Sequence, residues 1–475
     1  MMVQLKPDLC VIGAGSGGLS AAAAAAQLGV EVVLIERHKM GGECLNSGCV
    51  PSKALLAAAK RAQAMREAHK FGIRPVEPDI DHRAVHKHIQ GVIAAIAPND
   101  SVERYTGMGV KVILAEARFK DRGTVVAGDS EIQARRFVIA TGSAPLIPPI
   151  PGLDRIPYFT NETIFESASF LRHLIIIGGG PNGLELAQAY RRLGSEVTVI
   201  EADAPLAKDD PEMRRPVLAR LEEEGVRILD HARLERLEAR GGGIRAVFTK
   251  DGRAYSLDAT HLLVAAGRRP NIDSLNLEAA GIKYDPNGII VNSALKTSNR
   301  RVYAIGDAAN GPRFTHVANY HAGLVIRNAL FRIPVKADHL SIPWVTFTDP
   351  ELAHVGLTEE GARKRHGDKI QVLRWPYNEN DRAHAERETE GFLKVITTPG
   401  GRILGASMAG HNAGELIQMW SLAMQKGIDI KAMASITAPY PTLAEINKRA
   451  AVMHFIPKLT SPFPRRIIGW LAKLG

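Results

Sequence analysis

A buried apolar run followed by a glycine turn occurs twice in this chain of 475 residues. In the first copy, Leu9–Ile12 precedes GAGSGG, an Ala-rich segment and a second apolar run that leads to Glu36. In the second copy, Leu174–Ile177 precedes GGGPNG, a further periodic segment and an apolar run that leads to Glu201. Each copy predicts a strand, a tight turn, a helix and a second strand.

The glycines fall at matching positions in the two copies, namely Gly13, Gly15 and Gly18 in the first and Gly178, Gly180 and Gly183 in the second. Such glycines allow a tight turn and let backbone NH groups reach a pyrophosphate, and the acid about 20 residues later binds a ribose. A glycine turn in an ordinary strand-helix-strand unit explains one copy but not two. We therefore expect two dinucleotide-binding domains.

The rest of the chain predicts several further structural units. We expect a charged, mostly helical excursion at Arg61–Val110, short strands at Arg118–Ile139 and Leu234–Ala266, strands at Trp344–Phe347 and Phe392–Ile396, and helices from Ala413. The segments after Pro343 thus indicate a separate α+β unit. The fold class is α/β, with two Rossmann-like domains followed by this α+β domain.

Composition excludes several classes of protein. A hydrophobic share of 45% and a charged share of 23% are typical of a folded globule. The net charge of +10 has no accompanying basic stripe with aromatic residues, so we expect no nucleic-acid partner. The first residues lack the pattern of a secretory leader and no apolar run is long enough to span a bilayer, so we expect a cytoplasmic protein.

Two of the three cysteines lie five residues apart in GGECLNSGCVPSKALL. Cys44 and Cys49 occupy a glycine-bounded turn that runs into a helix expected to begin near Pro51, and a helix N-terminus stabilises a thiolate. A zinc site would need a second pair, and the remaining Cys10 falls inside the first strand, so we expect no metal site. The pair is therefore predicted to be redox-active.

The chain resembles the class I pyridine nucleotide-disulfide oxidoreductases, which include mercuric reductase and dihydrolipoamide dehydrogenase. The resemblance rests on the cysteine segment, the two glycine fingerprints, ATGSAP at 140–145, AAGRRPN at 265–271 and YAIGDAA at 303–309. It covers nearly the whole chain. It implies an enzyme that binds FAD at the first fingerprint and a nicotinamide cofactor at the second.

The resemblance also implies roles for individual residues. Cys49 would be the thiol that faces the flavin and Cys44 the thiol that faces the substrate, with Lys53 paired to Glu185 near the flavin. Glu36 would bind the adenosine ribose and Asp307 the ribityl chain of FAD. The remaining expected cofactor-binding residues, beyond the six fingerprint glycines, are Thr141, Gly142, Glu201, Gly267 and Gly306.

Glu201 also predicts which nicotinamide cofactor is used. No arginine follows it in Ala202–Pro205, and a carboxylate repels a 2′-phosphate, so we expect NADH rather than NADPH.

The chain departs from the family near its C-terminus. Disulfide reductases of this type resemble one another at HPTxxE, whereas this chain reads YPTLAE, with Tyr440 at the histidine position and Glu445 retained. Tyrosine has a pKa near 10 and is a poor base at neutral pH. Mercuric reductase is similar in carrying tyrosine there, but it also has a C-terminal cysteine pair, and no cysteine follows Cys49 here. Tyr440 is either part of the active site or an interface side chain.

We expect no catalytic role for the histidines of two further stretches. We assign His82, His86 and His88 to a charged surface helix, and His411 to a structural or interface position.

The last thirty residues carry six basic side chains and no acidic one. Drawn as a helix, 465–474 places apolar residues on one side and basic residues on the other, which is typical of an interfacial helix. It is also typical of a segment that packs on a partner subunit. The resemblance implies a homodimer in which one subunit completes the active site of the other.

The predicted domains are 1–150 (FAD, first part), 151–270 (nicotinamide cofactor), 271–342 (FAD, return) and 343–475 (dimerisation, with the basic tail). We expect electrons to pass from NADH through FAD and the Cys44–Cys49 disulfide to a small-molecule acceptor. A dihydrolipoamide dehydrogenase or other disulfide reductase, and a catalytically silent flavin-binding protein, remain alternatives.

Overall fold

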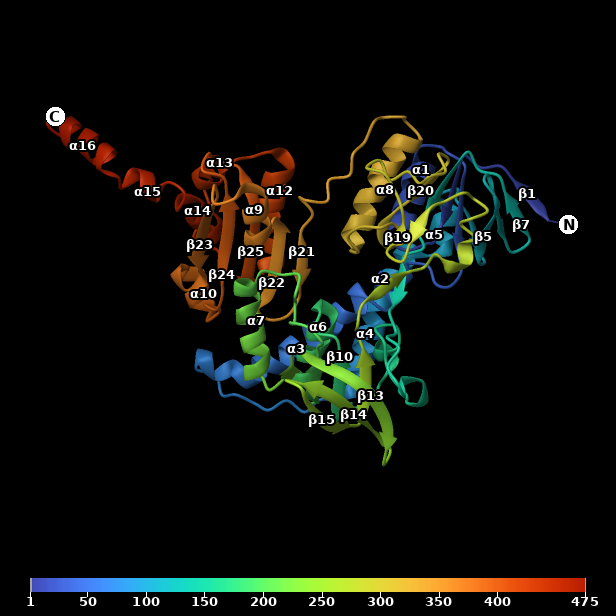
Figure 1. Cartoon of the computed structure of the whole chain (residues 1–475), viewed down its shortest axis with the longest axis horizontal. Coiled ribbons are helices and arrows are strands. Elements are labelled where there is room, and N and C mark those ends of the chain that lie inside the picture. The colour runs from blue at the N-terminus through green and yellow to red at the C-terminus, as the bar shows by residue number, and fades with distance from the viewer. Residues whose placement is uncertain (1, 475) are drawn as a thin grey trace. The chain divides into compact units, whose positions relative to one another are not determined.

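The computed structural model describes residues 2–474 and divides the chain into two compact units. The first unit contains residues 1–66, 77–202 and 229–338, and the second contains residues 67–76, 203–228 and 339–475 (Figure 1). No helix in this described part of the chain is both long enough and apolar enough to cross a membrane.

A parallel five-stranded sheet forms the centre of the first dinucleotide fold. Its order is β20-β8-β2-β3-β4, with β2 at Leu9–Ile12, β3 at Val32–Glu36, β4 at Lys111–Leu114, β8 at Arg136–Ile139 and β20 at Val302–Ala304. Every residue of β2 and β3 is buried, which is why both strands read as continuous apolar runs. Helix α1 (Ser16–Gln27) packs against α8 (Thr315–Ala329) beside this sheet.

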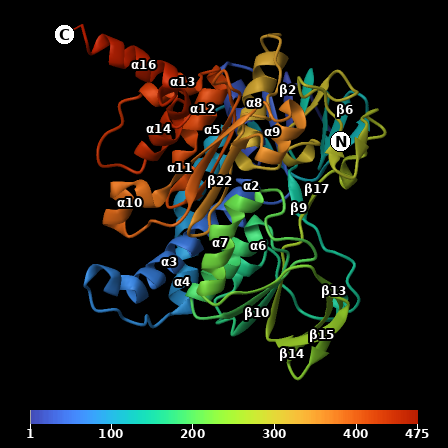
Figure 2. The same ribbon diagram turned by 60° about the vertical axis from the view of Figure 1, so that its left-hand side comes forward.

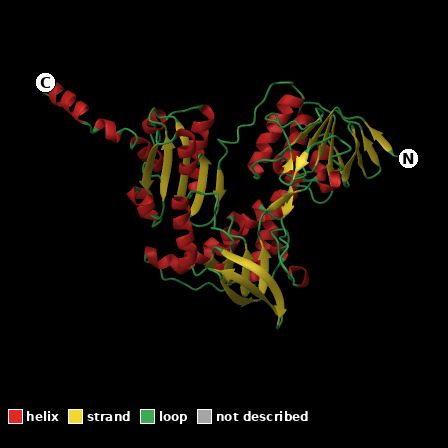
Figure 3. Ribbon diagram, in the orientation of Figure 1, coloured by secondary structure: helices red, strands yellow, loops and turns green. Residues whose placement is uncertain are grey.

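The second dinucleotide fold repeats the first. Strand β10 (His173–Ile177) lies between β11 (Glu196–Ile200) and β16 (His261–Val264), and all three are parallel. Helix α6 (Pro181–Arg192) joins β10 to β11. A curved antiparallel sheet of β13 (Ala232–Arg240), β14 (Gly243–Lys250) and β15 (Arg253–Ala259) belongs to the same unit (Figure 3).

Short strands and helices complete the first unit. The strands are β1 (Val3–Leu5), β5 (Ala117–Asp121), β6 (Thr124–Ala127), β7 (Ser130–Ile132), β9 (Ser143–Pro145), β17 (Arg268–Pro270), β18 (Tyr284–Asp285) and β19 (Gly288–Ile289). The helices are α2 (Gly42–Asn46), α3 (Cys49–Glu67), α4 (His82–Ile96) and α5 (Val102–Gly107). The expected helical excursion and the expected short strands are therefore both present.

The second unit is built on an antiparallel sheet in the order β21-β22-β25-β24-β23. The strands are β21 (Trp344–Thr346), β22 (Glu351–Gly356), β23 (Gln371–Pro376), β24 (Phe392–Thr397) and β25 (Ile403–Gly410). The helices are α9 (Glu359–His366), α10 (Asp381–Glu386), α11 (Ala413–Leu416), α12 (Gln418–Lys426), α13 (Ile430–Ser435), α14 (Glu445–Val452), α15 (Ile456–Leu459) and α16 (Pro462–Leu471) (Figure 2). This is the α+β unit that the sequence predicts.

A buried lysine helps to join α7 (Pro211–Glu223) to this second unit. Lys394 of β24 has a side chain only 2% exposed, and its ammonium lies 2.8 Å from Asp210 and 2.6 Å from Glu212. Glu359 supplies a third carboxylate at 3.0 Å. Because a buried ammonium needs charged partners, this cluster fixes residues 203–228 to the C-terminal sheet. The hydrophobic pattern alone had placed that segment with the second fingerprint.

Candidate active site

The backbone of the first glycine turn leaves no room for a side chain at two of its three glycines. Gly13 has φ +102°, and a Cβ there would lie 2.4 Å from the carbonyl oxygen of Ala140. A Cβ on Gly18 would lie 1.8 Å from the oxygen of Gly13. In contrast, a Cβ on Gly15 would meet only the Cα of Gly42, at 4.0 Å. Two glycines thus fix the backbone, and the middle one leaves open space beside the start of α1.

The second turn has the same division of roles. A Cβ on Gly178 would lie 2.5 Å from the oxygen of Ala265, and one on Gly183 would lie 2.0 Å from the oxygen of Gly178. A Cβ on Gly180 would meet nothing within 4 Å. An open middle position at a helix N-terminus is what a pyrophosphate requires for close approach to the backbone. Both turns therefore fit the phosphates of a dinucleotide.

The acid at the end of each repeat reaches back to its own glycine turn. Glu36 accepts a 2.7 Å hydrogen bond from the backbone NH of Ala14, and Glu201 accepts one of 2.6 Å from the NH of Gly179. Glu36 also accepts from the NH of His38 at 2.8 Å. The two carboxylates are thus held beside the turns, where the ribose of a bound dinucleotide would lie.

The cysteine segment packs directly on the first glycine turn. Gly41 donates its NH to the carbonyl of Ala14 at 2.9 Å, and a Cβ on Gly42 would lie 2.7 Å from the Cα of Gly15. Helix α2 follows at once and carries Cys44, which is half-buried. Cys49 is the first residue of α3, two residues earlier than the helix start near Pro51 that the sequence predicts. The thiol therefore lies at the helix N-terminus itself.

The two cysteines are free thiols with opposite pKa shifts. A hydrogen bond from Cys44 lowers the pKa of Cys49, and the Thr315 hydroxyl and the Lys53 charge act in the same direction. That same hydrogen bond, together with burial, raises the pKa of Cys44. The Sγ of Cys49 lies 3.2 Å from Oγ1 of Thr315. The surroundings therefore favour a thiolate at Cys49 over one at Cys44.

Lys53 and Glu185 form the ion pair that the family resemblance implies. The ammonium of Lys53 lies 2.7 Å from Oε2 of Glu185, whose side chain is only 3% exposed. Lys53 comes from α3, one turn after Cys49, and Glu185 comes from α6, directly after the second glycine turn. The pair therefore joins the cysteine helix to the second dinucleotide fold.

A second polar network surrounds Glu43, which the sequence analysis did not single out. Its carboxylate forms a bidentate ion pair with Arg268 and accepts from Asn161 at 2.7 Å. Burial raises the pKa of Glu43 to about 7, although the Arg268 guanidinium opposes that shift. Arg268 also donates to Oγ of Ser143 at 2.7 Å, and that hydroxyl donates to Asp307 at 2.5 Å. Glu43 and Asp307 are thereby connected through side chains.

The remaining expected cofactor residues lie in two loops that pair with each other. Thr141 donates its hydroxyl to the carbonyl of Asn271 at 2.7 Å, and Asn271 donates its NH to the carbonyl of Gly142 at 2.9 Å. Gly267, with φ +121°, precedes β17, which is antiparallel to β9. Gly306 begins the short turn that carries Asp307. These loops follow the carboxyl ends of β8, β16 and β20, where open parallel sheets bind ligands.

Tyr440 and Glu445 lie in the second unit and have different partners. Tyr440 is 72% exposed and donates its hydroxyl to Asp381 at 2.9 Å. The Asp381 carboxylate raises the pKa of Tyr440, which removes it further from the range of a general base at neutral pH. Glu445 begins α14 and forms an ion pair of 2.8 Å with Arg449.

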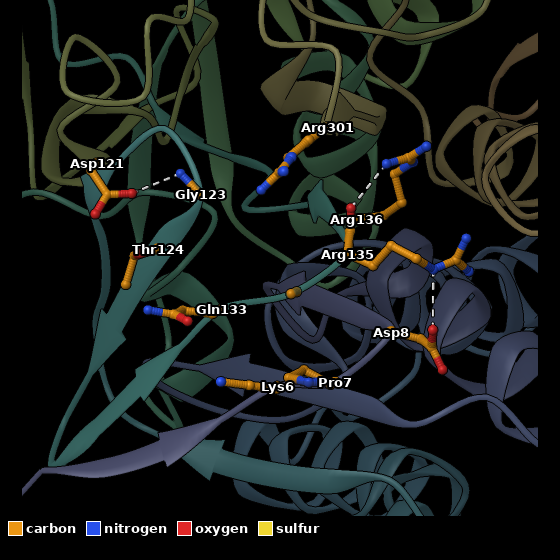
Figure 4. Close-up of a pocket in the computed structure, with 11 residues that line it drawn as sticks. Lys6, Pro7, Asp8, Asp121, Gly123, Thr124, Gln133, Arg135, Arg136 and Arg301 are labelled. Atoms are coloured by element: carbon orange, nitrogen blue, oxygen red, sulfur yellow. Dashed lines mark hydrogen bonds and ion pairs between the residues drawn. The ribbon is translucent and has the colours of Figure 1, made fainter.

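A polar pocket of about 630 Å³ lies elsewhere on the first unit (Figure 4). Four basic side chains and two acidic ones are among the residues that line it, namely Lys6, Arg135, Arg136, Arg301, Asp8 and Asp121. Arg135 donates to Asp8 at 3.1 Å. None of its lining residues belongs to a glycine turn or to the cysteine segment, so it is separate from the site described above.

One group of side chains has the spacing of metal ligands. Within residues 2–474, the only such group is Asp349, Glu388 and His411, whose ligand atoms lie within 4.8 Å of one another. It was missed because its members come from three separate loops. His82, His86 and His88 lie in α4, as expected, and are not part of this group.

Comparison with known families gives two adjacent matches. Residues 7–322 match the pyridine nucleotide-disulphide oxidoreductase family, and residues 342–451 match the dimerisation domain of the same family. Together they include all the residues of the site that are named above, and the second match ends at residue 451, before α15.

Individual relatives align over almost the whole chain. A mercuric reductase from Lysinibacillus sphaericus is 36% identical over 449 residues, which is 94% of this chain and 82% of the relative. A dihydrolipoyl dehydrogenase from Geobacillus stearothermophilus is 36% identical over 462 residues, covering 94% and 96%. Among solved structures, the HOCl-induced flavoprotein disulfide reductase RclA from Escherichia coli has a TM-score of 0.84 and 27% identity, covering 94% of this chain and 99% of that one.

Proposed function

Because this chain belongs to the pyridine nucleotide-disulphide oxidoreductase family, we propose that it carries electrons from NADH through FAD and the Cys44–Cys49 pair to a small acceptor. It is a flavoenzyme, and the family uses FAD together with a pyridine nucleotide. The acceptor, the choice of NADH and the role of each residue are our proposals.

The packing of the cysteine segment on the open glycine turn is the observation that carries this function. The contact between Gly42 and Gly15 keeps Cys44 and Cys49 close to the place where the first fingerprint would bind FAD. The second fingerprint, with an equally open Gly180, lies in the same compact unit. Both turns fit a dinucleotide, and the redox pair is attached to the first.

We assign the following roles to the residues of the chain. The glycine turns bind pyrophosphate, Glu36 and Glu201 bind ribose hydroxyls, and Asp307 orients the flavin side of the site. FAD held by these residues would supply the redox chemistry, taking a hydride from the reduced nicotinamide and passing two electrons to the disulfide. Two electrons and one proton then break the bond between the two sulfurs, and the proton stays on Cys44 while Cys49 keeps the charge.

The pKa shifts of the two cysteines support this division of labour. Cys49 is stabilised as a thiolate by Cys44, Thr315 and Lys53, which suits a sulfur that faces the flavin. Cys44 must lose its proton before it attacks or binds an acceptor. Glu43 precedes Cys44 in the chain, and its ion pair with Arg268 holds the carboxylate in place beside the cysteine segment.

Glu201 supports NADH as the reductant. Its carboxylate is held on the NH of Gly179, beside the position of the adenosine ribose. A 2′-phosphate on that ribose would meet a negative charge, and Ala202–Pro205 provide no arginine to neutralise it.

Tyr440 supports an acceptor that makes little demand on a protein base. A metal ion can bind the Cys44 thiolate directly, and a quinone can take protons from water. Reduction of a disulfide requires a proton for the departing thiol, which a tyrosine of raised pKa supplies slowly. We therefore place a metal ion or a quinone first. A disulfide acceptor is the second candidate, favoured by relatives such as the dihydrolipoyl dehydrogenase.

The remaining proposals concern domains and location. We assign FAD to residues 1–150 and 271–342, the nicotinamide cofactor to 151–270 and subunit contact to 343–475. The chain contains a dimerisation domain, and we propose a homodimer in which Tyr440 and Glu445 of one subunit approach the cysteines of the other. We propose the cytosol as its compartment, where the cysteine pair can cycle between its two states.

A substrate panel tests this function. Purified enzyme is assayed with NADH against a disulfide, dihydrolipoamide with NAD⁺, a thiol-binding divalent metal ion and a soluble quinone. Turnover with the metal ion or quinone that is lost in Cys44→Ser is expected. If no acceptor is reduced and NADH does not bleach the flavin, the protein is a silent flavin-binding protein and the proposal is wrong.

A further inference from the structure

The C-terminal helix α16 (Pro462–Leu471) leaves all its large apolar side chains uncovered. Neither α15 nor α16 contains a buried residue. The exposed side chains are Phe463 (71%), Ile467 (41%), Ile468 (63%), Trp470 (63%), Leu471 (50%) and, just beyond the helix, Leu474 (66%). Figures 1 and 2 both show α16 extending away from the sheet of the second unit. These side chains therefore add nothing to the core.

The apolar and the basic side chains of the tail lie on different sides of the helix. Phe463, Ile467 and Trp470 are spaced by three or four residues and so share one side of α16, with Leu471 beside them. Leu474, four residues after Trp470, continues this spacing just beyond the helix. Arg465, Arg466 and Lys473 lie on the other side, with Gly469 between them. The apolar side is thus continuous along the helix, and every ionisable group of the opposite side is a cation.

The charge of the tail favours an anionic surface over a second copy of the tail as the partner of the apolar side. After Glu445 the sequence has no acidic side chain and six basic ones. A second copy of the tail would bring Arg465, Arg466 and Lys473 against like charges, with no acid in either tail to neutralise them. An anionic lipid surface supplies both an apolar phase and the opposite charge.

The tail lies outside the part of the chain that matches the dimerisation domain of the family. The match to the dimerisation domain ends at residue 451, before α15 begins at Ile456. Trp470 lies next to the basic side, where an indole can keep its NH in the headgroup region while its ring enters the acyl chains. With 10 residues α16 is too short to cross a bilayer, so its contact with lipid would lie in the plane of the surface.

We propose that α16 binds the surface of an anionic membrane, with Phe463, Ile467, Trp470, Leu471 and Leu474 in the lipid and the basic side chains at the headgroups. This inference is independent of the electron acceptor. It places the flavoenzyme at a membrane surface, reversibly and through a helix that lies flat.

The test is co-sedimentation of the full-length holoenzyme with vesicles of phosphatidylcholine, with and without phosphatidylserine. Binding is expected only with phosphatidylserine, and it should weaken as salt is added. Truncation after Leu459, which removes residues 460–475, should abolish it. Trp470→Ser and the double variant Arg465→Gln/Arg466→Gln should each lower the partition coefficient about tenfold or more.

A matched control removes two charges elsewhere on the same unit. Lys426 and Lys431 are exposed and lie outside the tail, so Lys426→Gln/Lys431→Gln should bind vesicles like the wild type. Flavin absorbance of each variant reports whether the fold and cofactor are intact.

Each other outcome overturns the proposal. Equal sedimentation of full-length and truncated protein, or no binding by the full-length protein, would exclude a membrane role for α16. Loss of the dimer on truncation, without any vesicle binding, would show that a second subunit covers the helix. If the Lys426→Gln/Lys431→Gln control lost as much vesicle binding as Arg465→Gln/Arg466→Gln, the loss would come from net charge alone and not from the tail.

Discussion

The ammonium of Lys53 lies 2.7 Å from the buried carboxylate of Glu185, and the same lysine helps to lower the pKa of Cys49. Lys53 of α3 therefore has two roles: it binds Glu185 of the second dinucleotide fold, and its charge favours the thiolate form of Cys49. Its substitution should change the electrostatics of Cys49 without removing any sulfur chemistry.

Lys53→Met should raise the pKa of Cys49 by up to roughly one unit, because an opposite charge nearby favours the thiolate. The pH dependence of thiolate absorbance in the Cys44→Ala background would measure it. Lys60→Met, on the same helix, is the control and should leave the titration unchanged. An unaltered curve for Lys53→Met would show that the lysine acts only as the partner of Glu185.

The Arg268 network should be needed for tight flavin binding. Arg268→Lys loses the fork that pairs with both oxygens of Glu43 while also contacting Ser143, and Ser143 in turn holds Asp307. We expect the Kd for FAD to rise about tenfold, measured by flavin fluorescence on dilution. Arg269→Lys, at an exposed neighbour, should have the Kd of the wild type. Equal Kd values for FAD in the two variants would show that Arg268 does not contribute to flavin binding.

The nicotinamide preference should depend on Glu201. Wild-type protein is expected to have a higher kcat/KM with NADH than with NADPH by roughly tenfold or more, and Glu201→Gln should narrow that ratio. Glu196→Gln, at the exposed start of β11, the strand that ends just before Glu201, removes the same charge and should leave the ratio of the two kcat/KM values unchanged. Steady-state kinetics with both cofactors measures this ratio of kcat/KM values. A wild-type preference for NADPH would show that the assignment of NADH is wrong.

Tyr440 should set the class of acceptor. Tyr440→His, near the retained Glu445, should raise activity with dihydrolipoamide or a disulfide and leave the native reaction level or lower, because histidine is a base at neutral pH. Tyr440→Phe should change the native rate by less than about threefold, since the hydroxyl that is lost donates an exposed hydrogen bond to Asp381. Wild-type kcat/KM for dihydrolipoamide above roughly 10⁵ per molar per second would contradict the argument from tyrosine.

The sequence predicted those parts of the site that local backbone geometry requires. Gly13 and Gly178 need positive φ and close carbonyl contacts, so the glycine pattern predicts both turns directly. Cys49 was placed correctly at a helix N-terminus, although Pro51 suggested a start two residues late. Proline favours the first turn as a whole, and α3 simply begins before it.

Long-range pairs could not be predicted in this way. Glu43 and Arg268 are 225 residues apart, and only the folded sheets bring them together. Both lie in motifs that the sequence analysis quoted, but nothing local indicates that they form a pair. No motif in the sequence indicates that Thr315 lies beside Cys49. Likewise, nothing local indicates that Lys394 forms a buried ion pair with Asp210, which holds residues 203–228 in the second unit. Tertiary contacts decided each of these positions.

The most direct test of the central claim is anaerobic titration with NADH of the wild type and of the two cysteine variants. Wild-type protein should develop a long-wavelength absorbance band from the Cys49 thiolate beside the flavin. Cys44→Ser should retain the capacity for this band while losing turnover, and Cys49→Ser should lose the band while its flavin is still bleached by NADH. The same spectrum from both variants, or no band in the wild type, would contradict a Cys44–Cys49 pair that works between the flavin and the acceptor.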